Sequence, residues 1–258
     1  MPVRVTQALI TGASAGLGAE FARQLAARDV ALTLVARRRD ALESLAATLP
    51  VEVELIVADL ATADGVALVA DRLAAEPTVD LLVNNAGVGA YGAFDELDVA
   101  RQAGMVDLNV RALTTLTHAA VAAQRHHGGG GVINVGSTAG YQPDPFGAVY
   151  GATKAYVRSF TEALHEELAG SDVHAMLLAP GFTATEFQQV AGVAEGAMPS
   201  AAVMTAEPVV AAALADYAKG RAVCIPGGAN KLSAWGAQMT PSVVTRRVSK
   251  LVHERFRG

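Results

Sequence analysis

A tyrosine and a lysine four residues apart, Tyr150 and Lys154, are the side chains of this sequence best suited to acid–base chemistry. On a helix they project from the same face, about one turn apart. A phenol ordinarily loses its proton near pH ~10, and a nearby ammonium lowers that pKa by favouring the phenolate. Ser137, on an earlier segment, can donate a hydrogen bond to a carbonyl oxygen as it gains negative charge. The three residues indicate carbonyl reduction or alcohol oxidation. A Tyr-x-x-x-Lys pair alone is typical of exposed helix surface, so this interpretation depends on whether the chain binds a hydride carrier.

A glycine-rich turn near the amino terminus is the first indication of such a carrier. The apolar run 5–10 is typical of a strand, and residues 19–28 have the period of a helix. Between them lies Gly12-Ala13-Ser14-Ala15-Gly16-Leu17-Gly18. Glycines let the backbone approach a pyrophosphate, and a helix amino terminus offers N–H groups and the positive end of a dipole. The spacing differs from the usual fingerprint Gly-x-Gly-x-x-Gly. We interpret the turn as a nucleotide site; the alternative is a turn that uses glycine only for positive φ.

Three consecutive arginines, residues 37–39, follow the second apolar run, 31–36. In dinucleotide-binding folds an acidic residue at this strand end binds the ribose 2′-hydroxyl, whereas arginine accommodates a 2′-phosphate. The arginine fork suits phosphate. The sequence therefore predicts NADP(H) in preference to NAD(H). The alternative is a solvated helix start, in which Asp40 and Glu43 pair with these arginines.

The rest of the chain continues to alternate between strands and helices. Further strands are predicted at 51–57, 80–83, 132–135, 173–178 and 223–226, and helices at 40–49, 67–75, 99–125, 150–168 and 208–218. This alternation predicts an α/β fold of Rossmann type: a doubly wound, seven-stranded parallel sheet with helices on both faces, in a single domain spanning residues 1–258. Residues 184–206 have no clear period and are expected to form a lid over the strand ends.

The carboxyl-terminal tail has basic and apolar side chains on opposite faces from Ser242 to about residue 257. The pattern predicts a surface helix whose apolar face packs on its own domain or on a subunit. The alternative is a helix that lies on a membrane.

Composition narrows the class of protein. The 258 residues are 52% hydrophobic with a formal net charge of −5 and no charged block in the body of the chain, which argues against disorder and nucleic-acid binding. Cys224 is the one cysteine, so an internal disulfide is excluded. No apolar run reaches the ~18 residues of a membrane span, and the first residues lead directly into a strand. We therefore expect a soluble, cytoplasmic protein. His126 and His127 have no carboxylate or thiol nearby in the sequence, so no metal site is expected.

Taken in chain order, these motifs resemble the short-chain dehydrogenase/reductase family, over residues 11–185. The matching elements are Thr11-Gly12-x-x-x-Gly16-x-Gly18, Asp59, Asn84-Asn85-Ala86-Gly87, Asn109, Ser137, Tyr150-x-x-x-Lys154 and Pro180-Gly181. The glycine spacing that departs from the usual fingerprint is the form found in this family. These seven elements in the right order carry far more weight than any one of them.

The resemblance implies a catalytic role for four residues. Tyr150 would be the general acid in reduction and the base in the reverse direction. Lys154 would lower the pKa of this tyrosine and hold the nicotinamide ribose. Ser137 would polarise the carbonyl, and Asn109 would hold a water that connects Lys154 to solvent.

The resemblance also implies a longer set of cofactor contacts. These are Gly12, Ser14, Gly16, Leu17 and Gly18 in the glycine turn; Arg37 at or next to the cofactor-selecting position, with Arg38 as the neighbour that could share the phosphate; Asp59 and Leu60 at adenine; Asn85, Ala86 and Gly87 along the cofactor; Tyr150 and Lys154; and Pro180, Gly181, Thr183 and Thr185 at the nicotinamide.

The leading functional prediction is an NADP(H)-dependent reductase of a ketone or aldehyde, or a dehydrogenase of the corresponding alcohol. Apolar residues that are candidates for the substrate pocket are Tyr91, Phe94, Phe182, Phe187, Met198, Met204 and Trp235, which would favour a hydrophobic ketone but are equally compatible with core or subunit contacts. Two alternatives remain: a 3-oxoacyl-carrier-protein reductase, and a regulator that binds NADP(H) without turnover. The family commonly forms dimers or tetramers, here through the helices at 99–125 and 150–168.

Overall fold

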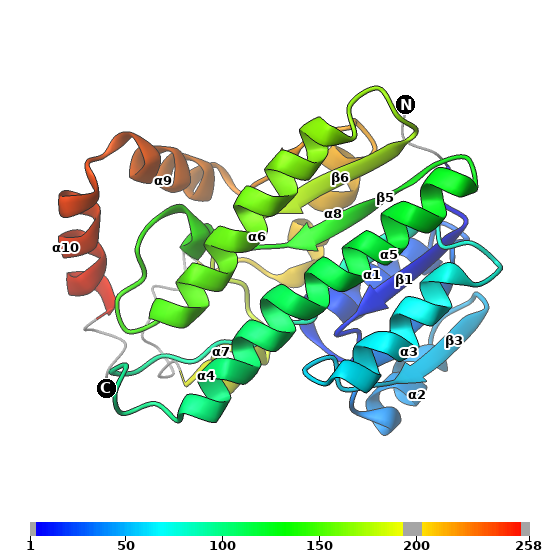
Figure 1. Ribbon diagram of the computed structural model, residues 1–258, viewed down its shortest axis with the longest axis horizontal. Coiled ribbons are helices and arrows are strands. Elements are labelled where there is room, and N and C mark those ends of the chain that lie inside the picture. The colour runs from blue at the N-terminus through cyan, green and yellow to red at the C-terminus, as the bar shows by residue number, and fades with distance from the viewer. Residues whose placement is uncertain (1–3, 193–202, 254–258) are drawn as a thin grey trace.

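A seven-stranded, wholly parallel sheet forms the centre of the molecule (Figure 1). The computed structural model describes residues 4–192 and 203–253. The strands are β1 Gln7–Thr11, β2 Ala31–Ala36, β3 Val53–Val57, β4 Leu81–Asn84, β5 Gly130–Val135, β6 Val173–Leu178 and β7 Val223–Cys224, in the spatial order β3-β2-β1-β4-β5-β6-β7. The chain thus builds outward from β1 to β3, then returns to the other side of β1 at β4. The predicted doubly wound Rossmann fold in one domain is confirmed.

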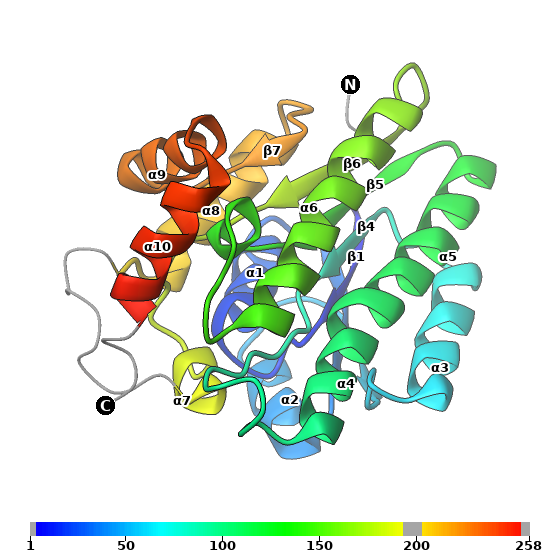
Figure 2. The ribbon, with the colours of Figure 1, turned by 60° about the vertical axis from the view of Figure 1, so that its left-hand side comes forward.

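Helices cover both faces of this sheet (Figure 2). They are α1 Gly16–Ala26, α2 Arg39–Ala46, α3 Ala63–Ala74, α4 Val99–Val106, the π-helical turn η1 Asp107–Ala112, α5 Leu113–His126, the 3-10 turn η2 Thr138–Tyr141, α6 Ala148–Glu167, α7 Phe187–Ala191, α8 Ala206–Tyr217, α9 Gly228–Met239 and α10 Ser242–His253. Helices α1, α2 and α8 pack on one face, and α3, α5 and α6 on the other.

Two hydrophobic clusters, one on each face, hold the layers together. Leu9 and Ile10 are adjacent in β1 and both fully buried, yet they belong to opposite clusters, because successive strand side chains point to opposite faces. On one face Phe21 of α1 packs against the sheet, and on the other Leu116 of α5 does so. Each such side chain contributes roughly 1.5–3 kcal/mol of hydrophobic free energy when fully buried.

The helix predicted at 99–125 is interrupted at its centre by the π turn η1. A π turn holds one residue more than an α turn and is often found at functional sites. Asn109 lies in this turn and is 1% exposed. Its amide accepts from the N–H of Val88 at 3.0 Å and donates to the carbonyl of Val88 at 2.9 Å and to Thr153 Oγ1 at 3.1 Å. The periodicity of the sequence does not distinguish this turn from the α-helices that flank it.

The last two helices lie beyond the β7 edge of the sheet (Figures 1 and 2). Helix α9 was not predicted, because Ala234 is its one buried residue and it carries no apolar stripe. In α10 the inward-facing residues are Thr245 and Ser249, at 8% and 3% exposure, whereas Val248 and Leu251 are 55% and 66% exposed. Of the two predicted arrangements, packing of these apolar residues on their own domain is therefore not found, and packing on a subunit stays a prediction. Among the described residues no helix has the length and apolar character needed to cross a bilayer.

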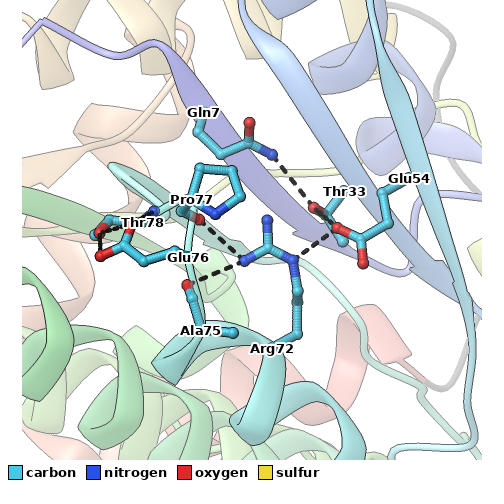
Figure 3. A network of polar contacts seen from close by, with 8 residues as sticks. All are labelled: Gln7, Thr33, Glu54, Arg72, Ala75, Glu76, Pro77 and Thr78. Carbon is cyan, nitrogen blue, oxygen red and sulfur yellow. Dashed lines mark hydrogen bonds and ion pairs between the residues drawn. The ribbon is translucent and has the colours of Figure 1, made fainter.

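An ionic cluster fastens α3 to the amino ends of three strands (Figure 3). The guanidinium of Arg72 contacts Glu54 of β3 at 2.6 Å and donates to the carbonyl oxygens of Ala75 and Pro77. Glu54 in turn accepts from the hydroxyl of Thr33 in β2 at 3.0 Å. The Arg72 side chain is only 11% exposed, so its hydrogen bonds replace most of its hydration.

We expect Arg72→Ala to lower the free energy of unfolding by ~1–3 kcal/mol, because Glu54 and two carbonyl oxygens lose a donor that is itself only 11% exposed. The measurement is urea unfolding followed by circular dichroism. Arg23→Ala is the matched control: Arg23 is 56% exposed and pairs with Glu20 on its own helix, so its loss should change stability by less than about 0.5 kcal/mol. Equal effects of the two substitutions would contradict the assignment.

Candidate active site

The carboxyl ends of β1 and β4 are tied together by side chains that were predicted from the motifs. Thr11 Oγ1 accepts from the backbone N–H groups of Asn85 and Ala86, each at 3.0 Å. The Asn85 amide donates to the carbonyl oxygens of Thr11 at 2.9 Å and Gly12 at 3.1 Å. Asn84 instead points into the core, where its amide donates to Asn134 Oδ1 at 2.9 Å. Of the two neighbouring asparagines, one therefore shapes the site and the other stabilises the sheet.

The glycine turn needs glycine at specific positions. Gly12 has a φ of +66°, and a Cβ there would lie 2.8 Å from Ala86 Cα. A Cβ on Gly18 would collide with the carbonyl oxygen of Gly12, so Gly18 serves the close packing of α1 against β1. Gly16, with a φ of +55°, faces Thr185 across the turn, at 3.1 Å from a notional Cβ. The turn thus leads into the amino terminus of α1, the geometry that suits a pyrophosphate.

Arg38 reaches back to the glycine turn. Its Nη2 lies 3.3 Å from Ser14 Oγ and 2.9 Å from a carboxylate oxygen of Glu186, at the far side of the site. Arg39 pairs with Glu43 at 3.6 Å, as the solvated alternative predicted for this arginine. Arg37 is exposed and makes none of the ion pairs found within the described residues. Of the three arginines, Arg38 is therefore the one that contacts the glycine turn, through Ser14.

Asp59 and Leu60 lie at the end of β3, where adenine contacts were predicted. Asp59 is half-buried and accepts from the N–H of Ala61 at 3.0 Å. It does not cap α3, since Thr62 holds that position and accepts from the N–H of Gly65 at 3.1 Å. The Leu60 side chain is buried in the cluster beneath α3, which leaves its backbone as the part that can meet a ligand.

Tyr150 and Ser137 are in direct contact. Tyr150 lies in the first turn of α6 and is 6% exposed, and Ser137 follows β5. Burial raises the pKa of the Tyr150 phenol above its ordinary value, the Ser137 hydrogen bond lowers it, and the Asp144 carboxylate raises it further. The sum keeps the phenol protonated at neutral pH, which is the state of a general acid.

Lys154 lies one turn further along α6 and is 5% exposed. Its Nζ donates to the carbonyl oxygen of Val135 at 2.9 Å and lies 5.8 Å from the centroid of the Tyr150 ring. Burial lowers the pKa of this ammonium from 10.5 to about 8. In the protein without ligand, the group that lowers the pKa of Tyr150 is Ser137, so the lowering by Lys154 stays a prediction.

Asn109 and Lys154 border the same small space. A Cβ on Gly87 would lie 3.2 Å from Asn109 Oδ1 and 3.5 Å from Lys154 Nζ. Glycine at this position keeps the two polar side chains accessible from the β4 loop. The predicted proton route through Asn109 needs this proximity, although the route itself stays a prediction.

The loop after β6 closes the remaining side of the site. Pro180 is buried, and its carbonyl oxygen accepts from the N–H of Thr138 at 3.0 Å. A Cβ on Gly181 would collide with Asn230 of α9, so this glycine allows α9 to approach the loop. Thr183 Oγ1 donates to the Gly181 carbonyl at 3.1 Å, and Thr185 Oγ1 lies 3.4 Å from the Thr183 carbonyl. Leu17, the remaining predicted contact, is half-buried and packs on the core.

Aromatic rings surround the Tyr150 phenol. The ring centroid of Tyr91 lies 5.8 Å from that of Tyr150, and the ring centroid of Phe187 lies 5.5 Å from it. Next to this cluster a cavity of about 260 Å³ is lined by Phe94 and by residues of the loops after β4 and before α6. Of the seven predicted pocket residues, Phe94 thus lines this cavity, and Tyr91 and Phe187 pack on the Tyr150 ring.

The other predicted pocket residues lie elsewhere. Trp235 is 65% exposed and Phe182 is 40% exposed. Met204 packs on the core beside α8, and its backbone pairs with Thr183. Met198 lies outside the described residues. The described residues contain no group of histidine, cysteine and carboxylate side chains fit to hold a metal ion.

Two polar residues of the site were missed by the sequence analysis. Asp144 is 7% exposed and accepts a hydrogen bond from the Tyr91 hydroxyl. Glu186, already noted, contacts Arg38. A signal existed for Asp144, a carboxylate between two prolines six residues before Tyr150. None existed for Glu186, which lies in a segment without a period.

Comparison with known proteins assigns the family. Residues 6–195 match the family described as short chain dehydrogenase. The chain therefore belongs to the short-chain dehydrogenase/reductase family, a family of oxidoreductases that use a nicotinamide nucleotide.

Similar proteins include both reductases and dehydrogenases. Over 187 residues the chain is 39% identical to sulfoacetaldehyde reductase 2 of Chromohalobacter salexigens, covering 70% of this chain and 74% of that protein. The fold of this chain matches a short-chain dehydrogenase of Sphingobium yanoikuyae in complex with NADPH, with a TM-score of 0.83 and 34% identity, covering 93% of this chain and 94% of that chain. It also matches a short-chain dehydrogenase/reductase of Burkholderia phymatum in complex with NAD, with a TM-score of 0.79, 26% identity and coverage of 91% and 93%.

The buried ammonium of Lys154 predicts a specific pH dependence of stability. Below pH 8 the lysine is protonated in both states, and the folded state bears the cost of the buried charge. Between about pH 8 and 10.5 unfolding takes up a proton, so the contribution to stability rises with pH. Lys154→Met removes this cost. Its stability relative to wild type should therefore fall by about 2–3 kcal/mol from pH 7 to pH 10.5, measured by urea unfolding without cofactor.

The measured quantity is the change of this stability difference with pH. Lys154→Met also loses the hydrogen bond to Val135, but that loss lowers stability by the same amount at every pH. Lys219→Met, at an exposed position, is the control and should show a difference from wild type that stays flat with pH. A flat difference for Lys154→Met as well would show that the ammonium is hydrated.

Proposed function

We propose that this chain is an NADP(H)-dependent carbonyl reductase that acts on hydrophobic ketones or aldehydes and catalyses the reverse oxidation of alcohols. The observation that carries the proposal is the buried Tyr150 phenol, bonded to Ser137 and one turn from the buried Lys154, at the carboxyl edge of a Rossmann sheet. That edge, beside the point where strand order reverses, is where such sheets bind nucleotides.

The residues present fit a nicotinamide dinucleotide. The positive φ of Gly12 and Gly16 and the close approach of Gly18 leave an open backbone turn at the start of α1 for the pyrophosphate. Ser14 and Arg38, which come from different loops and lie 3.3 Å apart, would together hold a 2′-phosphate. Thr183 and Thr185 would meet the carboxamide, and Lys154 would bind the ribose hydroxyls. When bound, the nicotinamide supplies or accepts the hydride.

The protein contributes orientation and proton transfer. Ser137 Oγ, which is hydrogen-bonded to the Tyr150 phenol, would donate to the substrate carbonyl and stabilise the charge that develops on it. Tyr150, protonated at neutral pH, would give its proton to that oxygen as the alcohol forms. Lys154 and Asn109, which both face Gly87, would return a proton from solvent. The apolar rings of Tyr91 and Phe187 exclude water from the phenol.

Two alternatives predict different observations. A carrier-protein reductase would need a basic surface at the cavity mouth, but the exposed residues there include Asp95, Glu96 and Asp98, and Arg38 is engaged on the opposite side of the site. A sensor would have no use for a buried acid paired with serine. A steady-state assay of NADPH consumption over a panel of ketones separates reductase from sensor, since a sensor binds NADPH but consumes none.

Removal of the phenol hydroxyl should abolish turnover while leaving cofactor binding intact. We expect Tyr150→Phe to lower kcat by about 100–10,000-fold, the usual contribution of a general acid, with the Kd for NADPH within about threefold of wild type. Tyr156→Phe is the matched control, since Tyr156 lies on the same helix, is 39% exposed and bonds to Thr114. A Tyr150→Phe enzyme with near-normal kcat would refute the proposed acid.

The cofactor preference depends on one arginine. We expect Arg38→Ala to raise the Kd for NADPH by about 10–100-fold, because a charge-assisted bond to the 2′-phosphate is lost, and to change the Kd for NADH by less than about twofold. Nicotinamide fluorescence titration measures both. Arg39→Ala serves as control, since Arg39 pairs with Glu43. If Arg37→Ala weakens NADPH binding and Arg38→Ala does not, the 2′-phosphate is bound by Arg37 instead. Equal affinity of the wild-type protein for NADH and NADPH would refute the preference for NADP(H).

A further inference from the structure

A carboxylate from the loop after β6 lies where the 2′-phosphate of the cofactor would bind. An oxygen of Glu186 is 2.9 Å from Nη2 of Arg38, and the same nitrogen is 3.3 Å from Ser14 Oγ. Ser14 and Arg38 are the side chains that would hold this phosphate. Among the described residues, Glu186 is the one carboxylate that forms an ion pair with Arg38. The arginine assigned to the cofactor is therefore already paired with an anion of the protein itself.

The residues on either side of Glu186 contact the proposed cofactor site. Thr185 lies against the glycine turn, 3.1 Å from a notional Cβ on Gly16. On the other side, the ring centroid of Phe187 lies 5.5 Å from that of Tyr150. Since both neighbours contact the site, the backbone keeps the carboxylate between them close to the glycine turn.

Hydrogen bonds within the loop fix its path. Gln188 Nε2 donates to the carbonyl oxygen of Thr183 at 2.7 Å. The N–H of Ala184 donates to the carbonyl oxygen of Met204 at 2.8 Å, and the N–H of Met204 donates to that of Phe182 at 2.9 Å. The position of the carboxylate is thus set by bonds on both strands of the loop.

The other arginines next to Arg38 do not take its place in this pair. Arg39 pairs with Glu43 at 3.6 Å, one turn along α2. Arg37 is exposed and makes none of the ion pairs found within the described residues. Both Arg37 and Arg38 attract a phosphate, whereas Glu186 repels it. The contribution of the carboxylate is therefore the change in affinity that follows when it alone is neutralised.

The two nicotinamide cofactors affect this ion pair differently. The free 2′-hydroxyl of NAD(H) is neutral and leaves the pair intact. A 2′-phosphate carries roughly 1.5–2 negative charges near neutral pH, so it must take Arg38 from Glu186 or share it. In either case the carboxylate is left close to a like charge. The cost falls on NADP(H) alone.

We propose that Glu186 is a specificity residue that competes with the 2′-phosphate of NADP(H) for Arg38 and thereby narrows the preference for NADP(H) over NAD(H). The inference rests on the proposed function, which assigns the phosphate to Arg38 and Ser14. Arg38 favours the phosphorylated cofactor, and Glu186 limits by how much. The narrower preference leaves NAD(H) able to compete for the site.

Neutralising the carboxylate tests this inference. We expect Glu186→Gln to lower the Kd for NADPH by about 3–10-fold, because competition for Arg38 and repulsion of the phosphate are both lost, and to change the Kd for NADH by less than about twofold. The side chains of Arg38 and Glu186 are 55% and 58% exposed, so solvent screening keeps the effect this small. Nicotinamide fluorescence titration without substrate measures both constants.

Fragments of the cofactor show where the carboxylate acts. Adenosine 2′,5′-bisphosphate carries the 2′-phosphate without a nicotinamide, and 5′-AMP lacks both groups. In calorimetric titrations Glu186→Gln should tighten binding of the bisphosphate by about 3–10-fold and change that of 5′-AMP by less than about twofold. A gain for NADPH that is absent for the bisphosphate would overturn the inference, because the effect would then lie at the nicotinamide.

Two control variants separate charge from shape. Glu186→Asp keeps the negative charge on a shorter side chain, so the ratio of the two Kd values should stay within about twofold of wild type. Glu43→Gln neutralises the partner of Arg39 and should likewise leave this ratio within about twofold. Thermal unfolding establishes that each variant is folded.

An unchanged ratio of the Kd for NADH to that for NADPH in Glu186→Gln would overturn the inference. An equal gain for both nucleotides would overturn it too, since the substitution would then act on the loop and not on the phosphate. Failure of the proposed function looks different. Wild-type protein that binds neither nucleotide refutes both proposals, whereas protein that binds both but reduces no ketone refutes the reductase alone, because the titrations need no turnover.

Discussion

The hydrogen bonds between the ends of β1 and β4 are the constraint on which the rest of the site depends. Thr11 accepts from two successive N–H groups of the β4 loop, and Asn85 donates back to the glycine turn. The tie fixes the turn against the strand at the place where the chain reverses its direction across the sheet. It leaves room there for glycine alone, as the φ of Gly12 and the contact at Gly18 require. Every other site residue enters from a strand end or helix that the sheet positions relative to this junction.

The sheet was predictable because its signal is local. Strands β2 and β6 have the predicted limits, since each is a predominantly apolar run, interrupted only by Thr33 or His174, and is buried on both sides. The failures have a common cause. Helix α9 has only Ala234 in the interior, so its sequence carries no stripe. The tail α10 has a stripe, but Thr245 and Ser249 face the protein instead. In both cases tertiary contacts, which no window of sequence contains, decide how the segment lies.

The site residues likewise divide into those that local motifs predict and those that depend on contacts between distant loops. Ser137, Tyr150, Lys154 and the glycine turn follow from motifs whose spacing is set by one helix or one turn, and the fold brings them together. The distinction between Arg37 and Arg38 depends on which side chain reaches Ser14, a contact between loops. Asp144 could not be assigned to the site from sequence, because its partner Tyr91, which also packs against Gly147, comes from a distant loop. Local motifs predict which residues form the site, whereas the contacts between loops can be seen only in the structure.

The ionic cluster of Arg72 lies at the amino edge of the sheet, whereas the residues proposed to be catalytic gather at the carboxyl edge. Stability and chemistry are thereby assigned to opposite ends of the same strands. Mutations in the loops after β4 and before α6 can change which substrates bind during evolution without disturbing the ionic cluster of Arg72. Descendants of this protein can therefore change their substrate range while the contacts that stabilise the sheet stay the same.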